Sequence, residues 1–146
     1  MTVMMAPCMR ERRRPFAGTE ADLHLMRTWL TKRLTESGLS TDDMTQVAVF
    51  VVNELAENAV KHTISGRGGT YTVCYRWQTT GHLWVAVADM GTDTDAVPTP
   101  GDLDDLEAET GRGLAIVAAL AESTDHDRLP DGGLRVWARI ARGGGE

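Results

Sequence analysis

The sequence predicts an α+β domain in which helices cover one face of a largely antiparallel sheet. Two long segments in the N-terminal half carry apolar residues at helical spacing. The rest contains short alternating segments, rich in β-branched and aromatic residues and separated by turn residues. At 146 residues the chain fits one domain with its own core. Helices and antiparallel strands in this order usually form two layers.

The first predicted helix begins after Thr19 and ends at Ser37-Gly38. Its apolar residues recur at helical spacing: Leu23, Met26, Leu30 and Leu34. A capping segment at 39–42 leads into a second helix, from about Asp43 to about His62. The glycine-rich turn 65–69 ends this second helix.

Four segments are predicted as strands, and they form two hairpins. The first hairpin comprises residues 70–78 and 83–88, and the second comprises about 124–129 and 134–140. Between the hairpins lies a loop, Asp89 to Thr110, whose prolines Pro98 and Pro100 interrupt regular structure. A loop of about twenty residues within a compact domain is often functional. A third helix follows, from Leu114 to about Ser123.

Charge and composition exclude several classes of function. A net charge of −6 disfavours binding to nucleic acid, which needs a concentrated basic surface. The basic cluster Arg10, Arg12, Arg13 and Arg14 is predicted to be a solvated arm in an N-terminal tail. No stretch approaches the roughly 18 to 20 apolar residues of a membrane span, and no secretory signal is recognisable, so we expect a cytoplasmic protein.

Cysteine and histidine provide no metal-binding pattern. Cys8 and Cys74 are predicted to be plain thiols, in a tail and a strand respectively. The histidines are scattered, without the paired spacing of a metal site: His24, His62, His82 and His126.

Two polar residues continue an apolar stripe on the second helix. Glu54 and Asn58 follow Val47, Phe50 and Val51 on that stripe. An unpaired polar group costs several kcal/mol to bury. Either this half of the helix emerges into solvent, or both side chains point into a ligand pocket. In a pocket, Asn58 Oδ1 can ligate Mg²⁺ and Glu54 can orient or deprotonate a nucleophile.

Two further segments have both a structural and a functional interpretation. Asp89 follows a strand, where an aspartate commonly begins a loop by accepting bonds from its own backbone. Alternatively it accepts a hydrogen bond from an amine such as that of adenine, with Gly91 letting the backbone approach the ring. The segment Gly111-Arg112-Gly113-Leu114 offers helix N-terminal amides to phosphate, although a plain loop is the commoner explanation.

Taken together, these segments resemble the histidine-kinase-like ATPase superfamily, also called GHKL. Residues 53–63 (NELAENAVKHT) look like its N-box, 89–93 (DMGTD) like its G1 box and 111–117 (GRGLAIV) like its G2 box. The resemblance implies the Bergerat ATP-binding fold, a two-layer sandwich with a mixed, mostly antiparallel sheet. It places the domain at 14–141, between a flexible tail 1–13 and a disordered tail 142–146.

The resemblance also implies ATP and Mg²⁺ as cofactors and a role for each matching residue. Asn58 would carry Mg²⁺ and Glu54 would be the general base, while Asp89 and Gly91 would form the adenine pocket. The phosphates would lie at the helix start, against Gly111, Arg112, Gly113 and Leu114. Lys61 and His62 would approach phosphate, although a packed His62 is nearly as well supported. The loop from Thr92 to Thr110 would be the ATP lid.

Two positions depart from the family pattern. Asp93 replaces the second glycine of the G1 box, and the lid is strongly acidic. Arg135 stands just before Val136 and Trp137, at a position where the family often has a threonine related to adenine contact. These departures bear on ATP affinity.

Within the superfamily the chain most resembles small bacterial anti-sigma-factor serine/threonine kinases and their actinobacterial relatives. The segments Arg14 to Leu34 and Gly132 to Ile140 look like their first strand and helix and their closing strand. The resemblance implies a kinase that binds a sigma factor and phosphorylates a small antagonist protein, and related small kinases tend to be homodimers. The alternative is a non-catalytic, nucleotide-dependent protein-binding module. Neither interpretation involves nucleic acid or a membrane.

Overall fold

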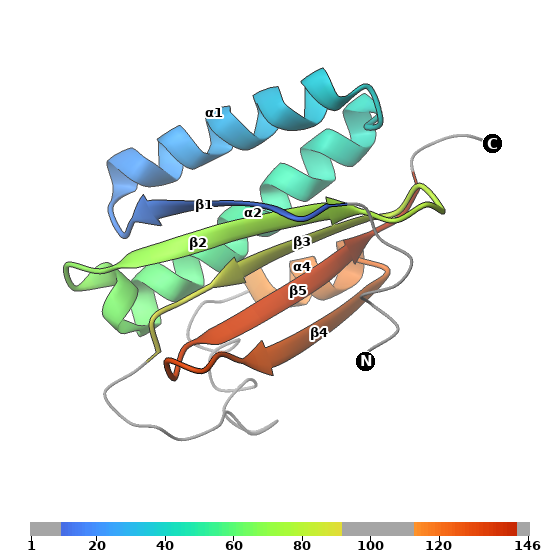
Figure 1. The fold of residues 1–146 in the computed structure, drawn as a ribbon. Helices are drawn as coiled ribbons and strands as arrows, with labels where there is room; N and C mark the ends of the chain where they lie inside the picture. Colours follow the sequence, from blue (N-terminus) through green and yellow to red (C-terminus); the bar gives the residue numbers. More distant parts are fainter. Residues whose placement is uncertain (1–9, 92–112, 143–146) are drawn as a thin grey trace.

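The computed structural model describes residues 10–91 and 113–142. Their strands form a five-stranded sheet in the order β1-β2-β3-β5-β4 (Figure 1). The strands are β1 (Arg12–Ala17), β2 (Thr70–Trp77), β3 (Leu83–Ala88), β4 (Ser123–Arg128) and β5 (Leu134–Ile140). Each neighbouring pair is antiparallel, so β1 and β4 are the edges of this sheet.

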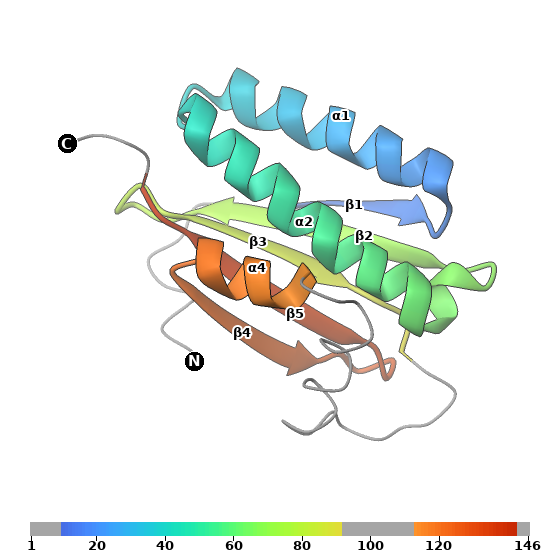
Figure 2. The same ribbon diagram turned by 180° about the vertical axis from the view of Figure 1, so that it is seen from behind.

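The helices lie together on one face of the sheet, as Figure 2 shows from the helical side. They are α1 (Glu20–Ser37), α2 (Asp42–His62) and α4 (Gly113–Leu120), and a short 3-10 turn, η2 (Ile64–Gly66), follows α2. The predicted α+β two-layer architecture is therefore confirmed, and the described sheet is antiparallel throughout. None of these helices is long and apolar enough to span a membrane.

Capping residues set the bounds of the two long helices. The Thr19 side chain accepts a hydrogen bond of 3.2 Å from Asp22 N at the start of α1, and Thr41 accepts one of 3.1 Å from Met44 N at the start of α2. Gly38 ends α1 in the left-handed conformation, with φ 73°. Both helices therefore begin and end close to their predicted bounds.

Most of the core lies between the helices and the sheet. The predicted apolar face of α1 is buried in full, at Leu23, Met26, Leu30 and Leu34. Alternate residues of the central strands complete this core, including Tyr71, Val73, Val85 and Ala138. A second buried cluster consists of Cys74, Trp84, Ala86 and Trp137. These four alternate with residues that face the helices, so they lie on the opposite face of the sheet.

The N-terminal boundary needs correction. Strand β1 begins at Arg12, within the segment that the sequence assigned to a flexible tail ending at residue 13. Arg12, Arg13 and Arg14 pair with Tyr75, Cys74 and Val73 of β2. The polar sequence of β1 predicts a solvated arm. Its strand conformation instead depends on pairing with β2. Cys8, the loop residues 92–110 and the end of the chain, 143–146, lie outside the described residues.

Candidate nucleotide site

The end of helix α2 is attached to the end of strand β3. Ile64 N donates a hydrogen bond of 2.8 Å to the carbonyl of Gly91, and Met90 N donates one of 3.0 Å to Ser65 Oγ. Ser65 is completely buried. These bonds bring the N-box helix and the G1 segment together, although the two are separated by β2 and β3 in the sequence.

Glu54 and Asn58 lie at the border of the buried face of α2. Both are half-buried, whereas Val51 on the same stripe is fully buried and Phe50 is 38% exposed. The amide nitrogen of Asn58 is buried and has no hydrogen-bond partner within the described parts of the chain. A buried polar atom in this state is unfavourable unless something else bonds to it. A ligand or a water molecule bonded to this nitrogen would satisfy it.

The environment of Glu54 favours its protonated form. Burial raises the pKa of Glu54, and the nearby carboxylate of Glu57 raises it further, while Lys61 lowers it. Glu57 itself accepts a hydrogen bond of 3.2 Å from Asn53 Nδ2. A raised pKa makes the Glu54 carboxylate a better proton acceptor.

Asp89 is held in place by backbone amides. Its Oδ1 accepts hydrogen bonds from Gly91 N at 2.7 Å and from Leu134 N at 3.1 Å, and Asp89 N donates to Leu134 O at 2.9 Å. The loop-starting interpretation of Asp89 is thus confirmed, and it is compatible with the functional one because these two bonds use Oδ1. Burial raises the pKa of Asp89, and the bonds from Leu134 and Gly91 partly oppose this rise.

Glycines pack closely against the backbone around Asp89. Gly91 has φ 84°, and a Cβ there would lie 2.8 Å from the carbonyl oxygen of Gly132. A Cβ on Gly133 would clash with the carbonyl oxygen of Asp89. The turn before β5 therefore packs directly on the end of β3. The sequence identified Gly132 and Gly133 as a hairpin turn, and only their spatial neighbours reveal this second role.

The structure describes only part of the predicted phosphate-binding segment. Gly113 is the first residue of α4, and this helix lies beside α2 (Figure 2). Gly111 and Arg112 lie outside the described residues, as does the side chain of Leu114. The phosphate-binding roles of these four residues stay predictions.

Two further predicted ligands lie at the C-terminal end of α2. Lys61 is exposed, whereas His62 is half-buried. Both belong to the last turn of the helix, beyond Asn58. Their approach to phosphate also stays a prediction.

Arg135 lies on the face of the sheet opposite the described helices. Its neighbours Val136 and Ala138 belong to the core beneath the helices, whereas Arg135 lies over the Trp137 ring at 5.1 Å. Its guanidinium donates to both carboxylate oxygens of Asp127, at 3.1 and 2.6 Å. The Arg135 side chain therefore points away from the helices and from Asn58.

The donor chemistry of the site suits a nucleotide with a hard cation. Asn58 supplies an amide and Asp89 a fixed carboxylate. Across residues 10–91 and 113–142, no group of three or more His, Cys, Asp or Glu side chains could hold a metal ion. Mg²⁺ beside nucleotides usually takes phosphate oxygens and water as further ligands.

Comparison with known proteins identifies the family. A family model described as histidine kinase-like ATPase domain matches residues 16–140. The chain belongs to this family. Membership of this family implies ATP binding. No curated protein matches the chain significantly.

Solved structures share the fold of this histidine kinase-like ATPase domain. One is the structure of the RsbU and RsbW domains of Rv1364c from Mycobacterium tuberculosis, with a TM-score of 0.65 and 19% identity over 90% of this chain. The match spans 32% of that chain, so this domain corresponds to about a third of it. Another is the SiaB-SiaC complex from Pseudomonas aeruginosa, with a TM-score of 0.62, 15% identity and coverage of 91% and 89%.

Proposed function

We propose that this domain binds Mg-ATP between α2, the end of β3 and the start of α4, and acts as a serine/threonine kinase of the anti-sigma-factor type. The observation that carries the proposal is the fixed carboxylate of Asp89, held by Gly91 and Leu134 amides at the point where β3 meets the end of α2. A carboxylate anchored through one oxygen offers the other to the exocyclic amine of adenine.

Other residues of the proposed site bind the metal ion, hold the phosphates and accept the proton. Asn58 Oδ1 ligates Mg²⁺, which offsets the charge that develops on the phosphates. Amides at the start of α4, with Lys61 and His62, hold the phosphates. Glu54 accepts the proton of the attacking serine hydroxyl, and its raised pKa suits it to this role.

The partner is proposed to be a sigma factor, a small antagonist protein carrying the acceptor serine, or both in turn. Support comes from the fold shared with the SiaB-SiaC complex and with the RsbU and RsbW domains of Rv1364c. A cytoplasmic homodimer is the expected state. Size-exclusion chromatography with light scattering tests the dimer directly.

A second candidate is a non-catalytic module that binds its partner according to nucleotide state. Asp93 favours it, because this residue replaces a glycine of the G1 box and adds a carboxylate next to the proposed site. Arg135 gives this candidate no support, since it lies on the other face of the sheet.

Two variants separate binding from catalysis. We expect Asn58→Ala to lose Mg-dependent ATP binding in calorimetry. We expect Glu54→Gln to keep that binding and to lose transfer of the γ-phosphoryl group to a partner serine. Wild-type binding without transfer to any sigma-factor antagonist would support the non-catalytic module. Equal Mg-ATP affinity in the wild type and Asn58→Ala would refute the assigned metal ligand.

A further inference from the structure

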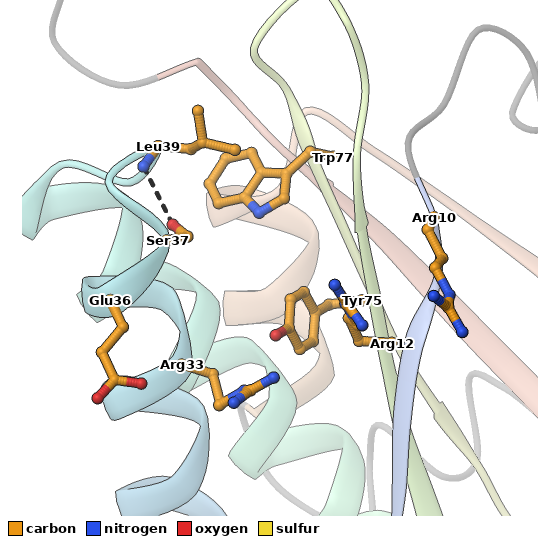
Figure 3. A pocket seen from close by; sticks show the side chains of 8 residues that line it. All are labelled: Arg10, Arg12, Arg33, Glu36, Ser37, Leu39, Tyr75 and Trp77. Carbon is orange, nitrogen blue, oxygen red and sulfur yellow. Dashed lines mark hydrogen bonds between the residues drawn. The ribbon is translucent and has the colours of Figure 1, made fainter.

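A pocket at the opposite end of the molecule gathers positive charge. It has a volume of about 360 Å³ and lies between the C-terminal end of α1 and the strands β1 and β2. Its lining includes Arg10, Arg12, Arg33, Glu36, Tyr75 and Trp77 (Figure 3). The pocket adjoins the loop between α1 and α2, whereas the nucleotide site adjoins the other end of α2. Helix α2 has 21 residues and is therefore about 30 Å long.

The three arginines of the pocket lack the carboxylate partners that several arginines of the sheet have. Arg13 and Arg76 contact Glu11, Arg135 contacts Asp127, and Arg139 contacts Glu122. By contrast, Arg10, Arg12 and Arg33 form no ion pair or hydrogen bond within residues 10–91 and 113–142. Their guanidinium groups are therefore available to a ligand.

The charge balance of the pocket opposes that of the whole chain. Three arginines and one glutamate line it, in a protein whose net charge is −6. In Figure 3 the Glu36 carboxylate extends away from Tyr75, whereas Arg33 reaches from α1 toward that ring. The floor consists of Tyr75 and Trp77, which are 5% and 6% exposed. A rigid aromatic floor beneath unpaired guanidinium groups suits carboxylate or phosphate oxyanions.

The position of β1 indicates an extended ligand. It is an edge strand, and its described partner is β2 alone, so one side of its backbone is open to another strand. Arg10 and Arg12 lie two residues apart, which in an extended chain separates them by about 7 Å. Acidic side chains at alternate positions of an added strand have the same spacing. Pro15 lacks an N–H and would end such pairing further along β1.

We propose that this pocket and the open edge of β1 bind an acidic, extended segment of a partner protein. The segment carries carboxylates at alternate positions, which meet the guanidinium groups of Arg10, Arg12 and Arg33. Its backbone pairs with β1 before Pro15. This site is separate from the nucleotide site, and its occupation requires no ATP.

The test uses the full chain and a synthetic acetylated peptide of sequence Glu-Thr-Glu-Thr-Glu. We expect calorimetry to show binding at low ionic strength and weakening as salt is raised toward about 0.5 M, because the contacts are between exposed charges. The double variant Arg12→Ala/Arg33→Ala is expected to bind at least about tenfold more weakly. Lys32→Ala, which removes one charge from the same helix outside this pocket, is the matched control and is expected to bind like the wild type.

Three outcomes would overturn the proposal. One is no measurable binding by the wild type, and another is equal loss of affinity in Lys32→Ala and the double variant. The third is binding of inorganic phosphate as tightly as the peptide, which would indicate a small-anion site. Circular dichroism and unchanged Mg-ATP affinity of the double variant show that it is folded, so failure here is distinguishable from failure of the proposed nucleotide site.

Discussion

The backbone N–H of Ile64 donates a hydrogen bond of 2.8 Å to the carbonyl of Gly91. This bond joins the segment after α2 to the segment after β3, and the bond from Met90 N to Ser65 Oγ reinforces it. Backbone contacts thus set the position of Asp89 relative to the helix that carries Asn58. We therefore expect the affinity of the proposed ATP site to depend on the backbone conformation at Gly91.

Alanine at Gly91 should be far more disruptive than alanine at another left-handed glycine. Gly38 has φ 73°, and no atom lies within 4 Å of the position that a Cβ would occupy there, so Gly38→Ala incurs only backbone strain of about 1 kcal/mol. At Gly91 the same strain adds to a contact of 2.8 Å with the carbonyl oxygen of Gly132. We expect Gly91→Ala to lower the free energy of unfolding by about 2 to 4 kcal/mol in urea titrations, and to weaken ATP binding.

The Gly38→Ala variant is the control for this experiment, because Gly38 caps α1 away from the nucleotide site. It should leave ATP affinity unchanged. Equal losses of stability in the two variants would show that the turn before β5 shifts to accommodate a Cβ at Gly91. Close packing at Gly91 would then not limit stability.

Two substitutions at Asp89 should separate its structural role from nucleotide recognition. Asparagine keeps an oxygen that can accept the bonds from Gly91 N and Leu134 N. The free energy of unfolding of Asp89→Asn should therefore lie within about 1 kcal/mol of the wild-type value. Alanine leaves both amides without this acceptor, so Asp89→Ala should lower the free energy of unfolding by about 2 to 3 kcal/mol. Both variants should bind ATP at least about tenfold more weakly, because neither presents a carboxylate to adenine.

Thermal or urea unfolding and ATP calorimetry on the same samples measure the two effects. Retention of full ATP affinity by Asp89→Asn would contradict the proposed contact with the adenine amine. Equal stability of the asparagine and alanine variants would contradict the structural role of Oδ1.

The sequence predicted most of the fold because its long helices carry their own signals. The apolar residues of α1 recur at helical spacing, and Thr19 and Gly38 cap its ends, so local pattern and tertiary structure agree. Strand β1 carries no such signal. Arg12, Arg13 and Arg14 are polar and Pro15 follows them, so their strand conformation depends on pairing with β2.

The sequence predicted which segments form the candidate site, but not the hydrogen bonds that hold them together. The positions of Glu54, Asn58 and Asp89 within family motifs identified them, and each is partly buried where the fold places it. Ser65 and Leu134 were missed, because a serine in a turn and the first residue of a strand have no distinguishing pattern. The outward direction of Arg135 follows from the register of β5, which only its pairing with β3 and β4 fixes.

The pH dependence of stability should report the environment of Glu54. Its pKa is raised in the folded state, so protonation is easier there than in the unfolded chain. The contribution of Glu54 to stability is therefore complete below its unfolded pKa, near 4.5, and is lost as the pH rises through the folded pKa. We expect Glu54→Gln to be more stable than the wild type at pH 7, by only about 0.5 kcal/mol because the half-buried group is partly screened by solvent. The difference should vanish toward pH 4.

Urea unfolding at several pH values measures this difference, and Glu57→Gln provides a second comparison. Removing the Glu57 charge should move the transition attributed to Glu54 to lower pH, because that charge raises the pKa of Glu54. A stability difference between Glu54→Gln and the wild type that does not depend on pH would exclude ionisation of Glu54 as its cause.

The pairing of Arg135 with Asp127 should matter for stability and not for nucleotide binding. Both bonds of the pair lie on the face of the sheet opposite the described helices, and Arg135 also covers the Trp137 ring. We expect Arg135→Ala to lower the free energy of unfolding by about 1 kcal/mol, and a double-mutant cycle with Asp127→Ala to give a coupling energy of about 0.5 to 1 kcal/mol. The ATP affinity of Arg135→Ala should equal that of the wild type, because the sheet separates this residue from α2. A clear fall in ATP affinity in a variant that is otherwise stably folded would instead place Arg135 within reach of the nucleotide.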